Sequence, residues 1–434
     1  MCFCVCFLSF ILTPILAQEF QVAKGKSSFS IRFKHVGSLA IIPLSINGSE
    51  PLNFVLDTGS PYTIITNLDA INHFELKKGS PVKISGLGRD LTKIDAYLSK
   101  ANSIKIGKAE SQKTDIVLIF NDSFDLSTRF GLPIYGIIGY DILKDFVAEI
   151  DYSKEKITFY QPEYFYTKKN LSKFEKLDLE LKNKKPYIQI KSNFNDQMIP
   201  LNLLIDTGSW EAFWLFEDPE KNILIPENSI EDYLGFGLNG EIHGKRTRLN
   251  FVEMGNYQIG KPTTSFPDSL SIAAVNRKER NGTIGSEILQ RFTTIYDYKN
   301  KAFYFKKNSK FGKPFHYNLA GLELYQPYPE LPYLEVSYVR KGSPADLAGL
   351  KKGDAIRLIN NKKIGVFNSS IYEDKFSALK SDFIEVSTKK REIITLPEII
   401  DLFKTKEGEK ITVVYTRGQE TFERRTSFKL EKSI

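Results

Sequence analysis

One seven-residue phrase occurs twice in this chain of 434 residues, and it constrains the fold more than any other feature of the sequence. Residues 54–60 read FVLDTGS and residues 203–209 read LLIDTGS. In each copy an apolar run typical of a buried strand ends at an aspartate, and a glycine two positions later permits a tight turn. A carboxylate at the end of a buried strand is costly unless it is paired or hydrogen-bonded. The two copies therefore predict two strand-to-turn units, each of which holds a carboxylate.

The two aspartates, Asp57 and Asp206, are the candidate catalytic residues. A single D-T-G is commonly an ordinary turn, but two copies in matching contexts indicate that the two carboxylates meet. Two carboxylates in contact share one proton, so the ionised partner can take a proton from water while the neutral partner polarises a carbonyl group. Such a pair would hydrolyse a substrate without a covalent intermediate. We expect the threonine hydroxyls to lock the turns and the serine hydroxyls to donate to the carboxylates, so the supporting residues are Thr58, Gly59, Ser60, Thr207, Gly208 and Ser209.

The segments that follow the two phrases also repeat each other. Each half has a glycine-rich turn, Gly86-Leu87-Gly88 in the first and Gly235-Phe236-Gly237 in the second. Farther on, IYGIIGYDILKDFVAEIDYSKEKITFY (134–160) matches RNGTIGSEILQRFTTIYDYKNKAFYF (280–305). Short alternating apolar runs between turn residues predict an all-β protein built from two homologous lobes.

The doubled phrase resembles the signature of the aspartic proteases, both pepsin-like and retropepsin-like, in which two hydrophobic residues precede D-[TS]-G-[ST]. The resemblance implies that Asp57 and Asp206 are the catalytic pair of an aspartic-type endopeptidase that acts on polypeptides. It also implies that the segments around Gly139 and Gly285 pass beneath the D-T-G turn of their own lobe. The glycine-rich hairpins stand where this family has its flap, a hairpin that covers the substrate. The candidate flap residues are therefore Gly86, Leu87, Gly88, Gly235, Phe236 and Gly237.

The first of these hairpins departs from the pepsin-like pattern. Those enzymes place a tyrosine near the flap tip, and none adjoins residues 86–88. Two ordinary surface hairpins are the alternative to a flap.

The chain from residue 309 onward has a different pattern. Residues 331–360 read LPYLEVSYVRKGSPADLAGLKKGDAIRLIN and resemble a PDZ domain, which binds an extended peptide at a sheet edge. The local signals agree, because Ser343 caps a short helix and Gly349 ends it. The resemblance makes LPEIIDLFK (396–404) the helix beside the peptide groove. It also assigns a candidate loop for a peptide carboxylate, made of Gly321, Leu322, Glu323 and Leu324.

A long connection precedes the groove helix. Roughly 30 residues, 365–395, separate it from the preceding strand, which is more than the usual connection and would alter or cover the groove. A PDZ module that packs on the lobes and binds nothing is the alternative.

The first 17 residues, MCFCVCFLSFILTPILA, predict a secretory signal peptide. The apolar run is too short for a membrane span, and it lacks the basic residue that usually precedes the apolar core. All three cysteines lie in this leader, so the mature chain would have no disulfide and no cysteine nucleophile. We therefore expect an exported protein, periplasmic or secreted, whose mature chain has no membrane span.

The formal net charge of +8 comes from lysines and arginines scattered along the chain. They form small clusters without aromatic stacking residues beside them, which indicates solvated surfaces and no nucleic-acid partner. The four histidines are dispersed, and no metal-ligand spacing, P-loop or G-x-S-x-G motif occurs. We expect no metal and no cofactor.

These patterns together predict a bilobal, all-β aspartic-protease fold followed by a PDZ-like α+β domain. The expected divisions are signal peptide, N-terminal lobe, linker, C-terminal lobe and PDZ-like domain, at residues 1–17, 27–160, 161–175, 176–308 and 309–434. The expected function is an exported aspartic endopeptidase, monomeric because one chain holds both lobes, whose PDZ-like domain binds a peptide or a protein C-terminus. The alternative is a catalytically inactive protease-like scaffold that acts as a PDZ peptide-binding adaptor.

Overall fold

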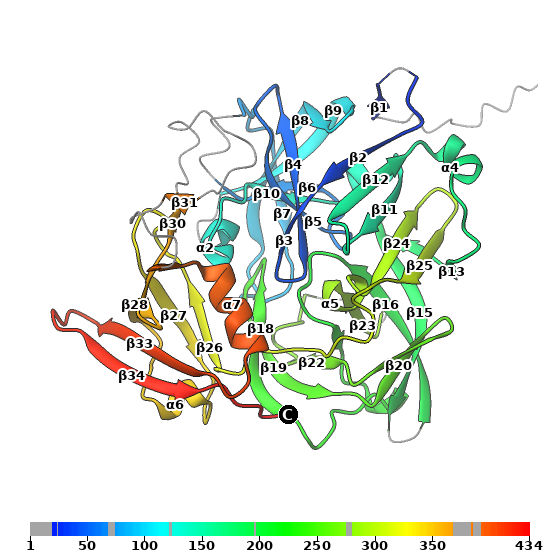
Figure 1. The fold of residues 1–434 in the computed structure, drawn as a ribbon. Helices are drawn as coiled ribbons and strands as arrows, with labels where there is room; N and C mark the ends of the chain where they lie inside the picture. The colour runs from blue at the N-terminus through cyan, green and yellow to red at the C-terminus, as the bar shows by residue number, and fades with distance from the viewer. Residues whose placement is uncertain are drawn as a thin grey trace, which may run out of the picture.

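The chain is mainly β, as the sequence predicts (Figure 1). The computed structural model describes residues 20–23, 25–67, 74–120, 124–194, 197–274, 280–367, 383–384 and 392–434. The predicted leader, 1–17, lies outside them, and so does most of the long connection 365–395. No helix within the described residues is long and apolar enough to cross a bilayer.

The first half of the chain forms a nine-stranded sheet around the first D-T-G turn. Its strands are β1 (Gln21–Val22), β3 (Lys34–Val36), β4 (Leu39–Ile46), β5 (Leu52–Leu56), β6 (Thr63–Ile65), β7 (Ser80–Ile84), β8 (Ile94–Ile106), β9 (Ala109–Ile119) and β10 (Gly136–Ile138). Two short helices, α2 (Leu126–Phe130) and α3 (Tyr140–Leu143), flank β10 in the chain. Strand β5 ends one residue before Asp57, and β10 runs parallel to it with Ile138 opposite Leu56.

The second half forms a ten-stranded sheet with the same plan around the second turn. Its strands are β14 (Glu180–Lys182), β15 (Lys185–Phe194), β16 (Gln197–Asp206), β17 (Phe213–Leu215), β18 (Ile230–Gly237), β19 (Gly240–Arg248), β20 (Phe251–Met254), β21 (Tyr257–Gly260), β22 (Thr263–Pro267) and β23 (Gly282–Gly285). A 3-10 helix η2 (Pro219–Lys221) and helix α5 (Ser286–Leu289) complete it. Strand β23 runs parallel to β16, with Ile284 opposite Ile205. This pairing repeats the β10–β5 pairing, so the sequence repeat is also a structural repeat.

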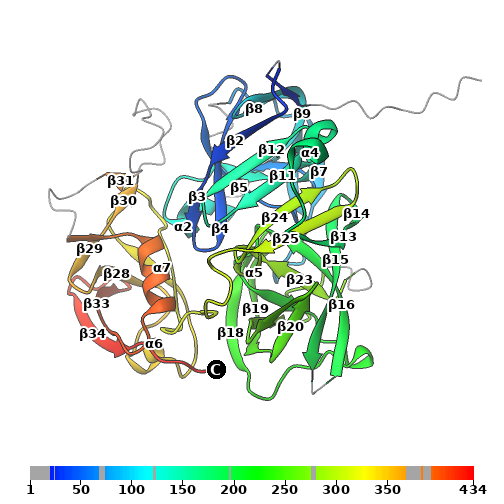
Figure 2. The same ribbon diagram turned by 45° about the vertical axis from the view of Figure 1, so that its right-hand side comes forward.

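A six-stranded sheet joins the two halves (Figure 2). Its order is β13 (Glu175–Asp178), β25 (Ala302–Lys307), β24 (Phe292–Asp297), β11 (Val147–Asp151), β12 (Lys156–Tyr160) and β2 (Ser28–Arg32). Strands β11 and β24 pair antiparallel in its middle, with Ile150 opposite Thr294. Because each half supplies three strands, backbone hydrogen bonds connect the two lobes directly.

The expected linker, 161–175, contains a helix that the sequence prediction missed. Helix α4 (Pro162–Lys168) starts with a proline in its first turn, and its Phe165 is fully buried. A seven-residue helix gives too short a periodic signal to recognise in the sequence. In the folded chain, the buried Phe165 side chain anchors this helix.

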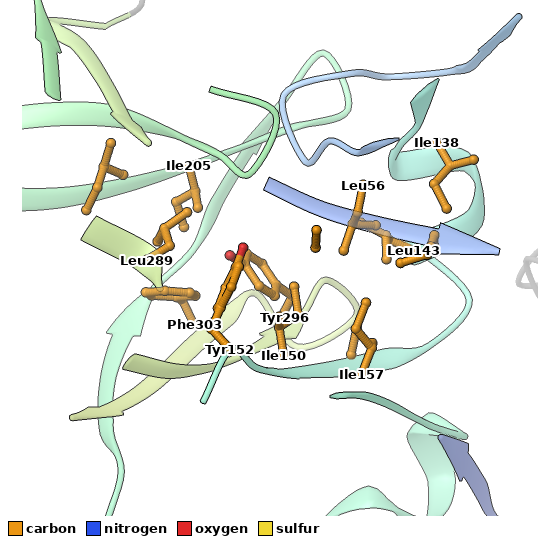
Figure 3. Packing of buried hydrophobic residues seen from close by; sticks show 14 of the residues in the cluster. Leu56, Ile138, Leu143, Ile150, Tyr152, Ile157, Ile205, Leu289, Tyr296 and Phe303 are labelled. Atoms are coloured by element: carbon orange, nitrogen blue, oxygen red, sulfur yellow. The ribbon is translucent and has the colours of Figure 1, made fainter. Parts of the chain in front are cut away.

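The main hydrophobic core lies between these sheets and includes residues of both lobes. Side chains below the two turns meet side chains of the six-stranded sheet, as Figure 3 shows for Leu56, Ile205, Ile150, Tyr296 and Phe303. The D-T-G strands therefore rest on a core that both halves of the chain build.

The C-terminal part has a seven-stranded sheet and a core of its own. Its strands are β26 (Leu322–Tyr325), β27 (Leu334–Val339), β28 (Asp354–Ile359), β29 (Lys362–Ile364), β32 (Ile393–Ile394), β33 (Lys410–Arg417) and β34 (Arg424–Lys429), and β30 (Val366–Phe367) pairs separately with β31 (Phe383–Ile384). Ser343 is the N-cap of helix α6 (Pro344–Leu347), and its side chain accepts from the Asp346 amide, as the sequence predicts. Helix α7 (Leu396–Thr405) begins with a capping box and lies on the side of this sheet that faces the lobes (Figures 1 and 2).

Candidate active site

Each aspartate is held by backbone amides of its own turn. The Asp57 Oδ1 atom accepts from the amides of Gly59 at 2.7 Å and Ser60 at 3.1 Å. The Asp206 Oδ1 atom accepts from the Gly208 amide at 2.9 Å. These bonds fix both carboxyl groups at the ends of β5 and β16, as expected for an aspartate that leaves a buried strand.

The two threonines of the motifs exchange hydrogen bonds across the lobes. Thr58 Oγ1 donates to the Ile205 carbonyl at 2.7 Å and accepts from the Thr207 amide at 3.1 Å. Thr207 Oγ1 donates to the Leu56 carbonyl at 2.7 Å and accepts from the Thr58 amide at 3.0 Å. The hydroxyls join each turn to the other, a pairing across the lobes that the sequence did not indicate. All four bonds join residues of different lobes, so this lattice sets the separation of the two aspartates.

The lattice brings the two carboxyl groups together. A Cβ atom on Gly59 would lie 2.9 Å from Asp206 Cγ, and one on Gly208 would lie 2.5 Å from Asp57 Cγ. Each carboxyl group therefore lies against the glycine of the opposite turn, where a side chain would collide with it. The turn glycines thus make room for the partner aspartate as well as for their own turn.

The environment of the pair favours retention of a proton. Burial raises the pKa of Asp57 well above its usual value, and the adjacent charge of Asp206 raises it further. Two close carboxylates cannot both ionise easily, so the pair holds one proton over a wider pH range than an isolated carboxyl group.

The expected role of the serine hydroxyls was wrong for Ser60. Its Oγ atom donates to the Tyr62 carbonyl at 2.7 Å, and its backbone amide makes the contact with Asp57. In the second turn the Ser209 carbonyl accepts from Ser286 Oγ at 2.5 Å and from the Ser286 amide at 2.8 Å. These contacts hold the turns to neighbouring backbone, while backbone amides make the hydrogen bonds to each Oδ1 atom.

The glycines after β10 and in β23 pass close to the turns, as the resemblance implies. The Tyr140 amide donates to the Ser60 carbonyl at 3.0 Å, next to Gly139. The Gly285 amide donates to the Ala212 carbonyl at 3.0 Å. A side chain at either glycine would meet backbone atoms of the turn region.

The two glycine-rich hairpins contact each other over the site. The Gly86 amide donates to Asn239 Oδ1 at 2.6 Å, and the Asn239 amide donates to the Leu87 carbonyl at 2.8 Å. The Gly88 amide donates to the Ser271 carbonyl at 2.9 Å, and Arg89 pairs with Asp268. The hairpins are therefore not two independent surface loops.

The sequence prediction omitted Asn239, which is the centre of this contact. Asn239-Gly240 between two strands is a turn signal that could have marked the tip of the second hairpin. The glycines of the partner hairpin mark its turn, but the backbone atoms of Gly86 and Thr92 that Asn239 contacts have no signal of their own.

A cavity of about 700 Å³ lies between the aspartates, the hairpins and the C-terminal part. Its lining includes Asp57, Asp206, Leu87, Phe236 and also Ile400 of α7. This volume is within the range of ligand-binding clefts. The sequence did not predict that α7 forms part of the cavity wall, because this helix is far from both D-T-G motifs in the chain.

The candidate carboxylate loop is only partly open. Leu322, Glu323 and Leu324 line the cavity, but the amides of Ala320 and Gly321 donate to Asn318 Oδ1 at 3.0 and 3.1 Å. The loop therefore does not present the Gly321 amide to a ligand, contrary to the prediction. Burial and the charge of Asp232 raise the pKa of Glu323 to about 7.

Among the described residues, no group of three or more His, Cys, Asp or Glu side chains is arranged to hold a metal ion. The chemistry available at this site is that of two carboxyl groups sharing a proton beside a partly apolar cavity.

A comparison with protein families agrees with this class of site. The family model described as Aspartyl protease matches residues 42–142, which include the first D-T-G turn. The solved structures similar to this chain include Basic 7S globulin from soybean, at 9% identity and a TM-score of 0.39 over 65% of this chain and 95% of that one. They also include aspartic proteinase from Irpex lacteus, at 11% identity and a TM-score of 0.42 over 65% and 98%. No curated protein matches the chain.

Proposed function

We propose that this chain is an exported aspartic endopeptidase with a PDZ-like domain. The observation that carries the proposal is the pair Asp57 and Asp206, held face to face at the junction of two β lobes beside a cavity of about 700 Å³. The aspartyl protease match over 42–142 supports a polypeptide as the substrate. The proposed chain is a monomer with a cleaved leader (1–17), lobes at 27–160 and 176–308, and the PDZ-like domain at 309–434.

The proposed reaction begins with one proton shared by the two carboxyl groups. Burial and the neighbouring Asp206 raise the pKa of Asp57, so we propose Asp57 as the partner that carries this proton. Asp206 then takes a proton from a water molecule as its oxygen attacks the peptide carbonyl carbon, while Asp57 donates its proton to the carbonyl oxygen. Asp206 then gives its proton to the peptide nitrogen while Asp57 takes a proton from a hydroxyl group of the tetrahedral intermediate. The C–N bond breaks, a carboxylic acid and an amine leave, and the pair again holds one proton. Activity is expected to decline when the pH rises enough to remove the shared proton.

The proposal is tested with mature protein, residues 18–434, and a mixed peptide library between acid and neutral pH. We expect cleavage that a statine-type inhibitor blocks and that Asp57→Asn and Asp206→Asn each abolish while the circular dichroism spectrum is unchanged. Asp178→Asn is the control, because Asp178 is an exposed aspartate at the surface. Near wild-type activity in Asp57→Asn would refute the dyad.

The adaptor alternative makes the opposite prediction. A folded wild-type protein that cleaves no peptide at any pH but still binds peptides would support the inactive scaffold.

A further inference from the structure

The groove between β26 and α7 opens directly into the cavity that holds the aspartates. The cavity lining runs from Asp57 and Asp206 past Trp210 to Leu324 on β26 and Ile400 on α7. A groove for an unrelated partner would be expected to open away from the two aspartates, whereas this groove is part of the same cavity as the aspartates.

Contacts at both ends of α7 fix the groove against the lobes. At the N-terminal end, a Cβ atom on Gly131 would lie 2.7 Å from Leu396 Cβ, so helix and lobe are in direct contact. At the C-terminal end, the Lys404 ammonium lies 5.1 Å from the ring centre of Trp210, the residue after the second D-T-G-S. The groove wall therefore has a fixed position relative to the dyad.

Strand β26 has a second set of anchors. The Gln326 amide, next to its end, donates to the Thr128 carbonyl of α2 at 2.8 Å. In the neighbouring strand segment, Arg340 pairs with Asp232 of β18 at 3.4 Å. These bonds join the C-terminal sheet to the lobe that carries α2 and to the hairpin that closes the cavity.

The groove has the chemistry of a site for an extended apolar peptide. Leu322, Leu324, Leu396, Ile399 and Ile400 line it. Strand β26 is at the edge of its sheet within the described residues, so its backbone can pair with an added strand.

The loop before β26 has no free amides at residues 320 and 321 to bind a terminal carboxylate. The amides at residues 320 and 321 are occupied by Asn318, and Glu323 lies next to them on the cavity wall. Arg246 is paired with Glu211 at 2.5 Å and with Asp232 at 2.7 Å, and the guanidinium of Arg129 lies over the rings of Phe236 and Tyr325. An internal segment of a polypeptide, which has no terminal charge, fits this environment better than a C-terminus.

We propose that the β26–α7 groove is a substrate subsite of the dyad cleft, which holds an internal, apolar segment of the same polypeptide that is cleaved. This inference rests on the proposed function. It makes Ile400 and Leu324 specificity-determining residues, which select substrates with an aliphatic side chain some distance from the scissile bond.

The test compares a long peptide substrate with a truncated version that retains cleavage but lacks the distal apolar segment. We expect Ile400→Ala to lower kcat/KM for the long peptide about 10-fold, the usual effect of removing apolar contacts from a pocket, and to leave the short peptide unchanged. Leu402→Ala is the matched control, because Leu402 is on the same helix and equally half-buried but is absent from the described cavity lining. It should change neither value.

A terminal-group series tests the kind of segment. Long peptides that end in a carboxylate, in an amide or in two further residues should have similar kcat/KM values. A requirement for the free carboxylate, or equal effects of Ile400→Ala on long and short peptides, would overturn the subsite while the proposed function stands.

A binding measurement separates the two failures. The affinity of Asp206→Asn protein for the labelled long peptide is measured by fluorescence polarisation. This affinity should fall when Ile400→Ala is added, and a statine-type inhibitor should displace the peptide. If the wild type cleaves nothing, the proposed function fails, yet this measurement still decides whether one peptide occupies both parts of the cavity. Peptide binding that neither Ile400→Ala nor the inhibitor affects would exclude the shared cleft.

Discussion

At the scale of single residues, the separation of the two aspartates depends on hydroxyl groups in the opposite lobe. Thr58 and Thr207 are fully buried, and each bonds to backbone atoms next to the other turn. The sequence identifies both threonines as turn residues, but only the folded chain brings their partners within reach. Loss of one hydroxyl would leave buried backbone groups without hydrogen bonds, which is costly.

We predict that Thr58→Val destabilises the protein by about 2–5 kcal/mol, because two buried hydrogen bonds lose their partner. The measurement is urea unfolding followed by circular dichroism. Thr66→Val is the control, since Thr66 is also buried but its Oγ1 atom has no hydrogen-bond partner among the described residues. It should stay within about 1 kcal/mol of the wild type. Equal destabilisation by both substitutions would contradict the role of the cross-lobe bonds.

Glu323 gives a prediction for pH. Its pKa is raised from an ordinary value of 4.5 to about 7, first by burial and then by Asp232. A raised pKa means that the folded state keeps the proton to a higher pH than the unfolded state does. The stabilisation by this bound proton is therefore fully present below about pH 4.5 and is lost as the pH rises through about 7. The side chains that face it are Asn318, which donates to it, and the charged Lys404 and Arg246.

Glu323→Gln should therefore flatten the decline of the melting temperature between pH 5 and pH 8, as measured by thermal unfolding at a series of pH values. Glu231→Gln, at an exposed position on β18, is the control and should follow the wild-type curve. A Glu323→Gln curve that parallels the wild type would show that this carboxyl group has no raised pKa.

At the scale of elements, the two hairpins act as one cover because their tips are bonded to each other. Each hairpin is visible in the sequence from its glycines, and the repeat places them at matching positions. Their mutual contact was not predictable, because Asn239 recognises backbone atoms of the loop after β7, and backbone recognition leaves no sequence signal. The helix α7 illustrates the same limit, since its amphipathic pattern predicts a helix but not which surface it faces.

We predict that Asn239→Ala lowers kcat/KM by about 10-fold or more, because the Gly86 amide and the Thr92 carbonyl both lose a side-chain partner over the cleft. The measurement is steady-state kinetics with the best peptide from the library. Asn256→Ala is the control, since Asn256 also lies in a tight turn of the second lobe but its side chain makes a solvent-exposed hydrogen bond to Glu175, away from the cleft lining. Unchanged kinetics in Asn239→Ala would mean that the hairpins close without this contact.

At the scale of the whole molecule, the two lobes are one folding unit and the C-terminal part has its own core. The central sheet takes three strands from each lobe, and the main cluster of buried residues includes both lobes. The residues of the C-terminal core form a separate cluster. The contacts between the lobes and the C-terminal part include the Arg340–Asp232 ion pair and the stacked rings of Tyr233 and Tyr338.

This arrangement predicts two calorimetric transitions, one for both lobes together and one for the C-terminal part. Phe303→Ala, in the lobe core, should lower the midpoint temperature of the first transition alone, by several degrees. Ile356→Ala, in the C-terminal core, should lower only the second. Differential scanning calorimetry makes the comparison, and a shift of every transition by either substitution would indicate a single cooperative unit.

The sequence by itself determined the catalytic candidates, the internal repeat and the mainly β character. These follow from short-range features, namely strand periodicity, turn residues and a motif whose residues are neighbours in the chain. The tertiary structure alone decided the cross-lobe threonine bonds, the contact between the hairpins, the different role of the Ser60 hydroxyl and the α7 wall of the cavity. Apart from the local bond between Ser60 and Tyr62, each of these joins residues far apart in the chain through groups that many partners can satisfy. Their partners are therefore fixed only when the core and the shared sheet bring the segments together.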